Sequence, residues 1–236
     1  MGAMALATKG SDVSAPPRLT AVVTDLDGVL CDTETVLVSA INRFLAEESQ
    51  EPLTYDEART MTGFDNDSWW RGVGQFRPSL NTPLDEYTHR VDMIARTLFP
   101  TELVVADGAI ELVAAIHQTG VPFALATSAR AAWAGQRLEI MGISDAFDQV
   151  LTADDVSAHK PNPEIYLKAT QALGVDPAET LAIEDSPSGI RAARDAGLYT
   201  IAIRTHWMRD VDQTYAHVIV DSLRDIDLDA LLAGGD

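Results

Sequence analysis

Two aspartates stand directly behind a short apolar run, in Thr24-Asp25-Leu26-Asp27-Gly28. Three more polar clusters follow along the chain: Thr127-Ser128-Ala129-Arg130, His159-Lys160-Pro161-Asn162-Pro163 and Glu184-Asp185-Ser186-Pro187-Ser188-Gly189. Each cluster alone is ordinary, because the same residue types form turns, helix caps and solvated surface pairs. Together they provide carboxylates, a lysine, hydroxyls and backbone N–H groups, which are the groups that phosphoryl transfer requires.

The acidic members of these clusters predict a magnesium site. Four carboxylates, on Asp25, Asp27, Glu184 and Asp185, would destabilise the fold if they met without a cation to neutralise them. Hard oxygen ligands of this kind favour Mg²⁺. Lys160, together with a hydroxyl and backbone N–H groups, could hold the oxygens of a phosphate.

The segments that position these clusters alternate between strands and helices. Short apolar runs predict strands at Leu19–Thr24, Val121–Ala126, Phe147–Leu151, Thr180–Ile183, Tyr199–Ile203 and Val218–Val220. Between them, helices are predicted at Asp107–Gln118, Ala131–Met141, Pro163–Leu173 and Ser188–Ala196, each with a glycine within two residues of its end. This alternation predicts an α/β fold with a doubly wound parallel sheet, in which ligands gather at the carboxyl ends of strands.

Residues 32–101 interrupt that rhythm with helices and no predicted strand. Apolar residues from Val36 to Leu45 recur at helical spacing, and Thr82-Pro83-Leu84-Asp85 predicts a second helix with Thr82 as N-cap. We therefore expect an N-terminal tail at 1–17, an α/β core at 18–31 and 102–236, and a helical insert at 32–101.

Composition limits the partners of the chain. It carries 36 acidic and 17 basic residues, a formal charge of −19, which repels nucleic acid and anionic membranes. A site for phosphate must therefore be locally positive. Cys31 is the single cysteine, and neither a spanning apolar run nor a secretory signal is visible, so a cytoplasmic protein is expected.

The four clusters, in this order, resemble the motifs of the haloacid dehalogenase-like superfamily of phosphohydrolases, and the likeness runs from Leu19 to about Val220. The helical insert resembles the cap found in its phosphoglycolate phosphatase and β-phosphoglucomutase branch. This resemblance implies a Rossmann-like core and Mg²⁺-dependent hydrolysis of a small phosphorylated metabolite, such as a sugar phosphate, through an aspartyl-phosphate.

The resemblance also implies roles for the core residues. Asp25 matches the nucleophile and a metal ligand, and Asp27 matches the general acid and base, whose backbone carbonyl also binds the metal. Asp185 matches a metal ligand, with Glu184 as a further ligand or its supporting partner. The phosphate would be held by Thr127, by the N–H of Ser128 and by Lys160.

Further residues are candidates for substrate contact, each with a plainer alternative. Arg130 follows the second motif, and Asn162 could orient Lys160 or start a turn. The cap candidates are Glu34, Gly63, Asn66, Trp69 and Arg71. For Trp69 a place in the cap core is an equal alternative, for Arg71 a surface role, and for Glu34 a hydrogen bond at the hinge.

Three other activities are alternatives to a phosphatase. Asp27 argues against a dehalogenase, which needs neither that aspartate nor a metal. Between residues 32 and 101 there is no lysine, which argues against a Schiff-base phosphonoacetaldehyde hydrolase. A β-phosphoglucomutase-like transferase stays open as the second hypothesis, although Asn66 and Ala129 depart from its pattern. A non-catalytic binding protein, and a monomeric or homodimeric state, are also left open.

Overall fold

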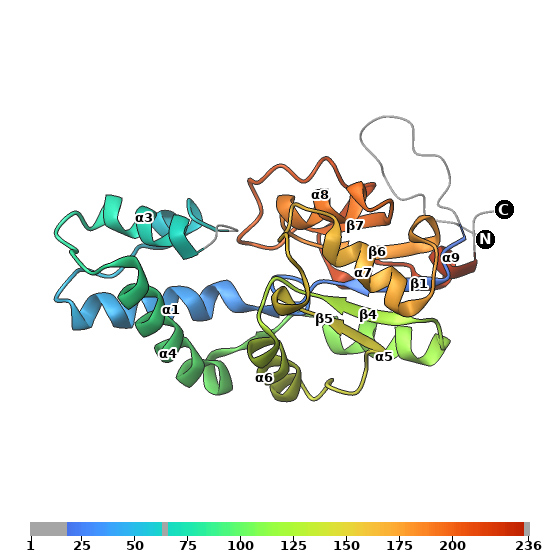
Figure 1. The fold of residues 1–236 in the computed structure, drawn as a ribbon, viewed down its shortest axis with the longest axis horizontal. Coiled ribbons are helices and arrows are strands. Elements are labelled where there is room, and N and C mark those ends of the chain that lie inside the picture. Colours follow the sequence, from blue (N-terminus) through green and yellow to red (C-terminus); the bar gives the residue numbers. More distant parts are fainter. Residues whose placement is uncertain (1–17, 63–65, 234–236) are drawn as a thin grey trace.

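The computed structural model describes residues 18–62 and 66–233, and its centre is a sheet of six parallel strands (Figure 1). The strand order is β5-β4-β1-β6-β7-β8, so β1 lies in the middle, where the chain switches from one side of the sheet to the other. The strands are β1 (Ala21–Thr24), β4 (Phe123–Ala126), β5 (Gln149–Leu151), β6 (Thr180–Glu184), β7 (Tyr199–Ile203) and β8 (Val218–Val220). The predicted doubly wound α/β sheet is thereby confirmed.

Helices cover both faces of this sheet because successive strand residues point to opposite sides. Val22 belongs to one buried cluster with α5, α6 and α9, whereas Val23 belongs to another with α7 and α8. These helices are α5 (Ala109–Thr119), α6 (Ala131–Met141), α7 (Glu164–Leu173), α8 (Pro187–Asp195) and α9 (Leu228–Ala233). Short 3₁₀ turns lie at Ala153–Asp155, Pro177–Glu179 and Leu223–Asp225.

The inserted helices form a separate group at one end of the sheet (Figure 1). They are α1 (Thr33–Glu47), α2 (Tyr55–Arg59), α3 (Asn66–Phe76) and α4 (Leu84–Glu102), and their apolar residues make a third buried cluster. A small antiparallel pair, β2 (Cys31–Asp32) with β3 (Val104–Val105), lies where the chain leaves and re-enters the core. Of the domain boundaries proposed above, 31/32 lies within β2 and 101/102 in the last turn of α4; both stay a prediction.

One core loop also reaches the inserted helices. Trp207 is buried in their apolar cluster, and its Nε1 donates a hydrogen bond of 3.1 Å to Asp32, the N-cap of α1. Arg59 of α2 pairs with Asp210, and Tyr55 packs against Trp207 with ring centroids 5.0 Å apart. The loop after β7 therefore joins the core to α1 and α2.

The expected N-cap at Thr82 is wrong. Helix α4 begins at Leu84 after Pro83, and no side chain caps it. The hydroxyl of Thr82 instead donates to Glu48 at 3.3 Å, because the end of α1 lies beside it. Among residues 18–62 and 66–233, no helix is long and apolar enough to cross a membrane.

Candidate active site

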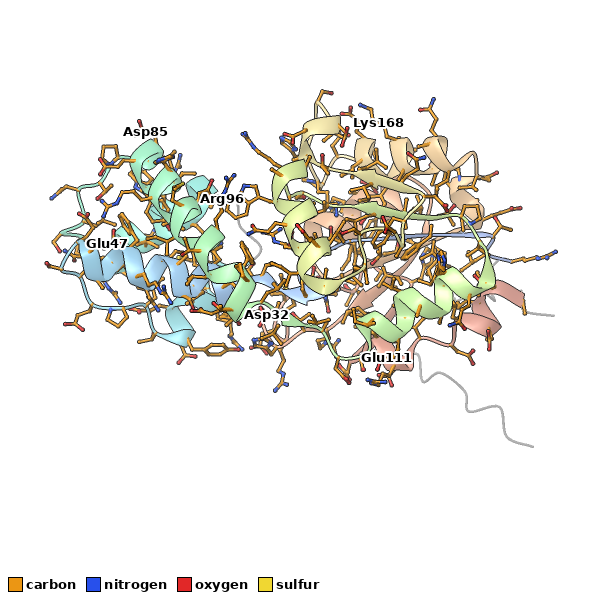
Figure 2. All side chains as sticks on the ribbon, turned by 90° about the horizontal axis from the view of Figure 1, so that it is seen from below. Asp32, Glu47, Asp85, Arg96, Glu111 and Lys168 are labelled. Atoms are coloured by element: carbon orange, nitrogen blue, oxygen red, sulfur yellow. The ribbon has the colours of Figure 1, made fainter. Side chains whose placement is uncertain are left out.

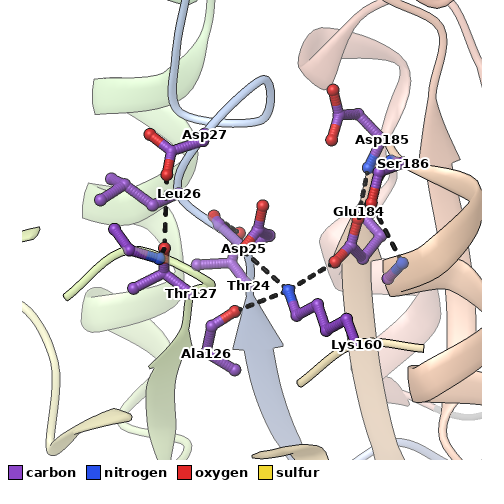
Figure 3. Close-up of polar contacts among 12 residues, drawn as sticks. Thr24, Asp25, Leu26, Asp27, Ala126, Thr127, Lys160, Glu184, Asp185 and Ser186 are labelled. Carbon is purple, nitrogen blue, oxygen red and sulfur yellow. Dashed lines mark hydrogen bonds and ion pairs between the residues drawn. The ribbon is translucent and has the colours of Figure 1, made fainter. Parts of the chain in front are cut away.

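Lys160 lies at the centre of the polar cluster at the carboxyl ends of β1, β4 and β6 (Figure 3). Its Nζ donates to Asp25 Oδ1 at 2.9 Å, to Glu184 Oε1 at 2.6 Å and to the carbonyl of Ala126 at 2.9 Å. Although burial lowers the pKa of the ammonium, Asp25 and Glu184 raise it, and the net change is upward. The lysine is therefore held as a cation between two carboxylates.

Glu184, the last residue of β6, has its oxygens occupied by hydrogen bonds. Oε1 accepts from Lys160 and from the hydroxyl of Tyr166 at 2.9 Å. Oε2 accepts from the N–H groups of Asp185 at 2.9 Å and Ser186 at 3.1 Å. A carboxylate has about four lone-pair positions, so these donors use most of its capacity.

Asp25 and Asp185 are buried carboxyls with displaced pKa values. Burial raises the pKa of Asp25 to about 7, Lys160 opposes this rise, and Glu184 and Asp27 add to it. Burial likewise raises the pKa of Asp185, and the neighbouring carboxylates of Glu184 and Asp25 raise it further. Crowded carboxyls of this kind are relieved when a cation binds beside them.

The residues present fit a divalent cation with oxygen ligands. Asp25, Glu184 and Asp185 each offer one oxygen, and these three atoms lie within 4.8 Å of one another. Carboxylate oxygens in this number suit Mg²⁺ rather than a soft metal. Because Glu184 is already engaged by its donors, Asp25 and Asp185 are the two side chains most open to the ion.

The glycine in the turn after β1, Gly28, leaves space for the carboxylate of Asp185. Gly28 has a φ of +81°, a conformation that favours glycine, and a Cβ there would lie 1.9 Å from Asp185 Oδ2. A side chain at this position would therefore displace the carboxylate of Asp185.

Thr127, the first residue of the Thr127-Ser128-Ala129-Arg130 cluster, contacts Asp27 (Figure 3). Thr127 is fully buried, and its Oγ1 donates to Asp27 Oδ2 at 3.4 Å while accepting from the N–H of Ala129 at 3.0 Å. The side chain of Asp27 thus points toward Thr127 and away from Lys160. Asp25 and Asp27 occupy different surroundings although only Leu26 separates them.

Three predicted contact residues lie at the exposed rim. Ser128 and Arg130 are exposed, and the backbone of Arg130 forms the N-cap of α6. Asn162 is exposed too, and its Oδ1 accepts from the N–H of Glu164 at 3.0 Å, which is the turn-starting alternative. Substrate contact by these residues stays a prediction.

The cap candidates are spread over α1 and α3. Trp69 is 2% exposed within the apolar cluster of the cap, so its packing is that of a core residue. Arg71 is exposed on α3, and Glu34, in the first turn of α1, raises the pKa of Asp185. Gly63 lies outside the described residues, as does the side chain of Asn66.

Two buried supports of the acidic cluster were not anticipated from the sequence. Tyr166 of α7 contacts Glu184 through its hydroxyl, and Gln213 is 2% exposed in the loop after β7. The Nε2 of Gln213 donates to the carbonyls of Asp185 and Ile203 and so fastens the turn that carries the acid. Neither residue lies in a motif, and Gln213 stands between Asp212 and Thr214, so no local sequence signal marks it.

Arg137 of α6 was also missed. Its guanidinium lies 2.8 Å from Asp27 Oδ1 and 3.0 Å from Oδ2, and the side chain is 8% exposed. In the sequence, it reads as one polar position on an amphipathic helix.

Comparison with known proteins agrees with this arrangement. The model of the haloacid dehalogenase-like hydrolase family matches residues 22–203. A validoxylamine A 7′-phosphate phosphatase of Streptomyces hygroscopicus subsp. limoneus is 40% identical over 102 residues, which are 43% of this chain and 48% of that protein. A phosphorylated carbohydrates phosphatase of Thermotoga maritima is 32% identical over 80% of this chain and 87% of its own length.

Among solved structures, CbbY of Rhodobacter sphaeroides in complex with phosphate has the same fold. Its TM-score is 0.75 at 24% identity, with 89% of this chain and 96% of that chain covered. The family match spans most of the chain and includes every strand of the sheet from β1 to β7. This chain is a member of the haloacid dehalogenase-like hydrolase family.

Proposed function

We propose that this hydrolase is a Mg²⁺-dependent phosphatase of small phosphorylated metabolites, with a sugar phosphate or a similar monoester as substrate. The observation that carries the proposal is the junction of Lys160 with Asp25 and Glu184, beside Asp185, at the switch point of the sheet. The relatives named as phosphatases of phosphorylated carbohydrates and of validoxylamine A 7′-phosphate support this substrate class.

Asp25 is the proposed nucleophile because its carboxylate lies at the end of the central strand, beside the lysine and the acidic cluster. One of its oxygens would attack phosphorus in line with the departing alcohol and become an aspartyl-phosphate. Lys160 offsets the negative charge of the attacking carboxylate and the phosphoryl oxygens. When bound at Asp25 and Asp185, Mg²⁺ would supply further charge neutralisation at the phosphoryl group.

Asp27 is the proposed general acid and base. It would give a proton to the alkoxide leaving group and then take one from the water that hydrolyses the aspartyl-phosphate. Thr127, with the N–H of Ser128, would hold a phosphoryl oxygen. We assign Glu184 a supporting role: its hydrogen bonds orient Lys160 and the backbone of Asp185.

We propose the reducing cytoplasm as the compartment of this activity, in keeping with a single cysteine, Cys31, which is buried and free. The partner is a small phosphorylated molecule rather than nucleic acid or a membrane, given the formal charge of −19. Transfer to a second hydroxyl, as in a β-phosphoglucomutase, would use the same core and differ in the acceptor.

The test is a panel of sugar phosphates and other phosphate monoesters, with Mg²⁺ or with a chelator, and with Asp25→Asn as the control. We expect phosphate release from at least one ester that needs both Mg²⁺ and Asp25. If no ester releases phosphate above the Asp25→Asn background, the proposal fails. Interconversion of hexose 1- and 6-phosphates with little free phosphate would replace it with the mutase.

A further inference from the structure

The ion pair between Arg137 and Asp27 joins α6 to the turn after β1. Arg137 Nη1 lies 2.8 Å from Asp27 Oδ1 and 3.0 Å from Oδ2, while Thr127 donates to Oδ2 at 3.4 Å. The two donors contact the carboxylate from α6 and from the end of β4. Between them they restrict the rotation of the Asp27 side chain.

The guanidinium is itself held in place by aromatic rings. Its carbon lies 4.6 Å from the ring centroid of Phe99 and 5.6 Å from that of Trp133. Phe99 belongs to α4 and Trp133 to α6, and the two rings meet edge to face at 5.8 Å. Arginine stacks on aromatic faces more readily than lysine, so this environment suits a guanidinium.

Burying the ion pair between Arg137 and Asp27 costs desolvation free energy, which hydrogen bonds to every polar atom would offset. The side chain of Arg137 is 8% exposed, and its Nε has no hydrogen-bond partner among the described residues. An apolar side chain between Phe99 and Trp133 would avoid the cost of desolvating a cation. The guanidinium is therefore not explained by packing alone.

We infer that Arg137 is a positioning residue for Asp27, and this inference rests on the proposed function. It fixes the Asp27 carboxyl in the orientation from which that group serves the leaving oxygen, while Phe99 of α4 and Trp133 of α6 fix the guanidinium. Arg137 itself need not touch the substrate. Its loss should affect the proton donated to the leaving group more than binding or attack by Asp25.

The test compares two esters that differ in their need for a proton. A sugar phosphate releases a poorly leaving alkoxide, whereas p-nitrophenyl phosphate releases a stable anion without acid help. For Arg137→Met, which keeps a long apolar chain between the rings, the first-step rate should fall at least about tenfold on the sugar phosphate. On p-nitrophenyl phosphate, the burst of nitrophenolate should stay within about twofold of the wild-type rate, because no proton is needed there.

The matched control is Arg96→Met. Arg96 (Figure 2) also lies over the ring of Trp133, at 5.1 Å, but within the described residues it forms no ion pair with Asp27. It should keep the wild-type ratio of the two rates. Arg137→Lys restores a cation and should recover part of the lost rate on the sugar phosphate. If Arg137→Met does not fold, the ratio of the two rates is measured with Arg137→Lys instead.

Coupling between the two residues gives a second readout. In an Asp27→Asn background, Arg137→Met should cost little more, because a positioning residue has nothing left to position. Additive losses, an equal loss on both esters, or a wild-type ratio in Arg137→Met would each overturn the inference while leaving the phosphatase intact. If the wild-type protein releases phosphate from no ester of the panel, the proposed function fails and the inference falls with it.

Discussion

At the scale of single residues, this site depends on where side chains are missing as much as on where carboxylates lie. Gly28 leaves room for Asp185, and Gly189 leaves room for Glu184, since a Cβ on Gly189 would lie 1.7 Å from Glu184 Oε1. Glu184 cannot move aside freely because it is fully buried and bonded to Lys160. A methyl group can therefore disturb the charge arrangement without touching a reacting atom.

Gly189→Ala tests this dependence. Alanine normally stabilises a helix interior, but here the added methyl should displace Glu184 and cost about 1–3 kcal/mol in the free energy of unfolding. The turnover of a phosphate ester should fall at least about tenfold, because Lys160 loses an oriented partner. Urea unfolding and phosphate release measure the two effects.

Gly135→Ala is the matched control within α6. A Cβ at Gly135 meets nothing within 4 Å, so alanine there should raise the free energy of unfolding by about 0.5–1 kcal/mol and leave turnover unchanged. If both variants behave alike, the close approach between Gly189 and Glu184 has no energetic consequence.

At the scale of elements, polar contacts of one histidine connect β7, α8 and the start of β8 at one edge of the sheet. His217, just before β8, accepts a hydrogen bond at Nδ1 from the N–H of Thr200 at 2.9 Å. Its ring stacks on Tyr199 at 4.4 Å and contacts Arg194 of α8. Burial, together with the positive charge of Arg194, lowers the pKa of His217 to about 4, so the neutral imidazole is favoured.

This shift predicts a loss of stability in acid. An unfolded histidine has a pKa of about 6.5, so between about pH 6.5 and 4 the unfolded chain binds a proton that the folded chain does not. The contribution of His217 is complete above pH 6.5 and disappears as the pH falls to about 4. Allowing for its partial exposure, we expect about 1–2 kcal/mol over this range.

Urea unfolding of His217→Gln at pH 7 and near pH 4.5 measures the contribution. The difference in unfolding free energy between wild type and variant should shrink in acid. A difference for His217→Gln that does not change with pH would exclude His217 as a source of acid sensitivity.

The sequence predicted elements best where their signals are local. Helix α6 has the predicted bounds Ala131–Met141, because Gly142 ends it with a φ of +71°. Helix α3 was missed because Gly72 and Gly74 weaken its helical pattern. Gly72 is required by packing, since a Cβ there would lie 2.2 Å from Met61 Sδ, and such a tertiary contact leaves no local signal.

The same distinction applies to the site. Asp25, Lys160 and Asp185 stand in motifs at strand ends, and the structure brings them together with Glu184. Arg137 lies 110 positions from its partner Asp27, so the pair exists only once α6 lies beside the turn after β1. Long-range pairs of this kind depend on helix rotation and rotamer choice, which periodicity alone does not determine.

At the scale of the whole molecule, the acidic surface opposes the chemistry at its centre. The chain has a formal charge of −19, whereas the proposed substrate is a phosphate dianion. Repulsion between charges of the same sign slows encounter, and salt weakens it by shortening the Debye length from about 30 Å at 0.01 M to about 8 Å at 0.15 M. Basic residues near the site, such as Arg130, act over a shorter range.

We therefore expect kcat/KM for a phosphate monoester to rise about twofold or more over that range of salt, at constant free Mg²⁺, while kcat stays unchanged. The separation arises because salt alters encounter with the free enzyme but not the chemistry of the bound ester. Initial rates at subsaturating and saturating ester measure the two quantities. A fall in kcat/KM with salt would mean that the local cations outweigh the net charge and already attract the substrate.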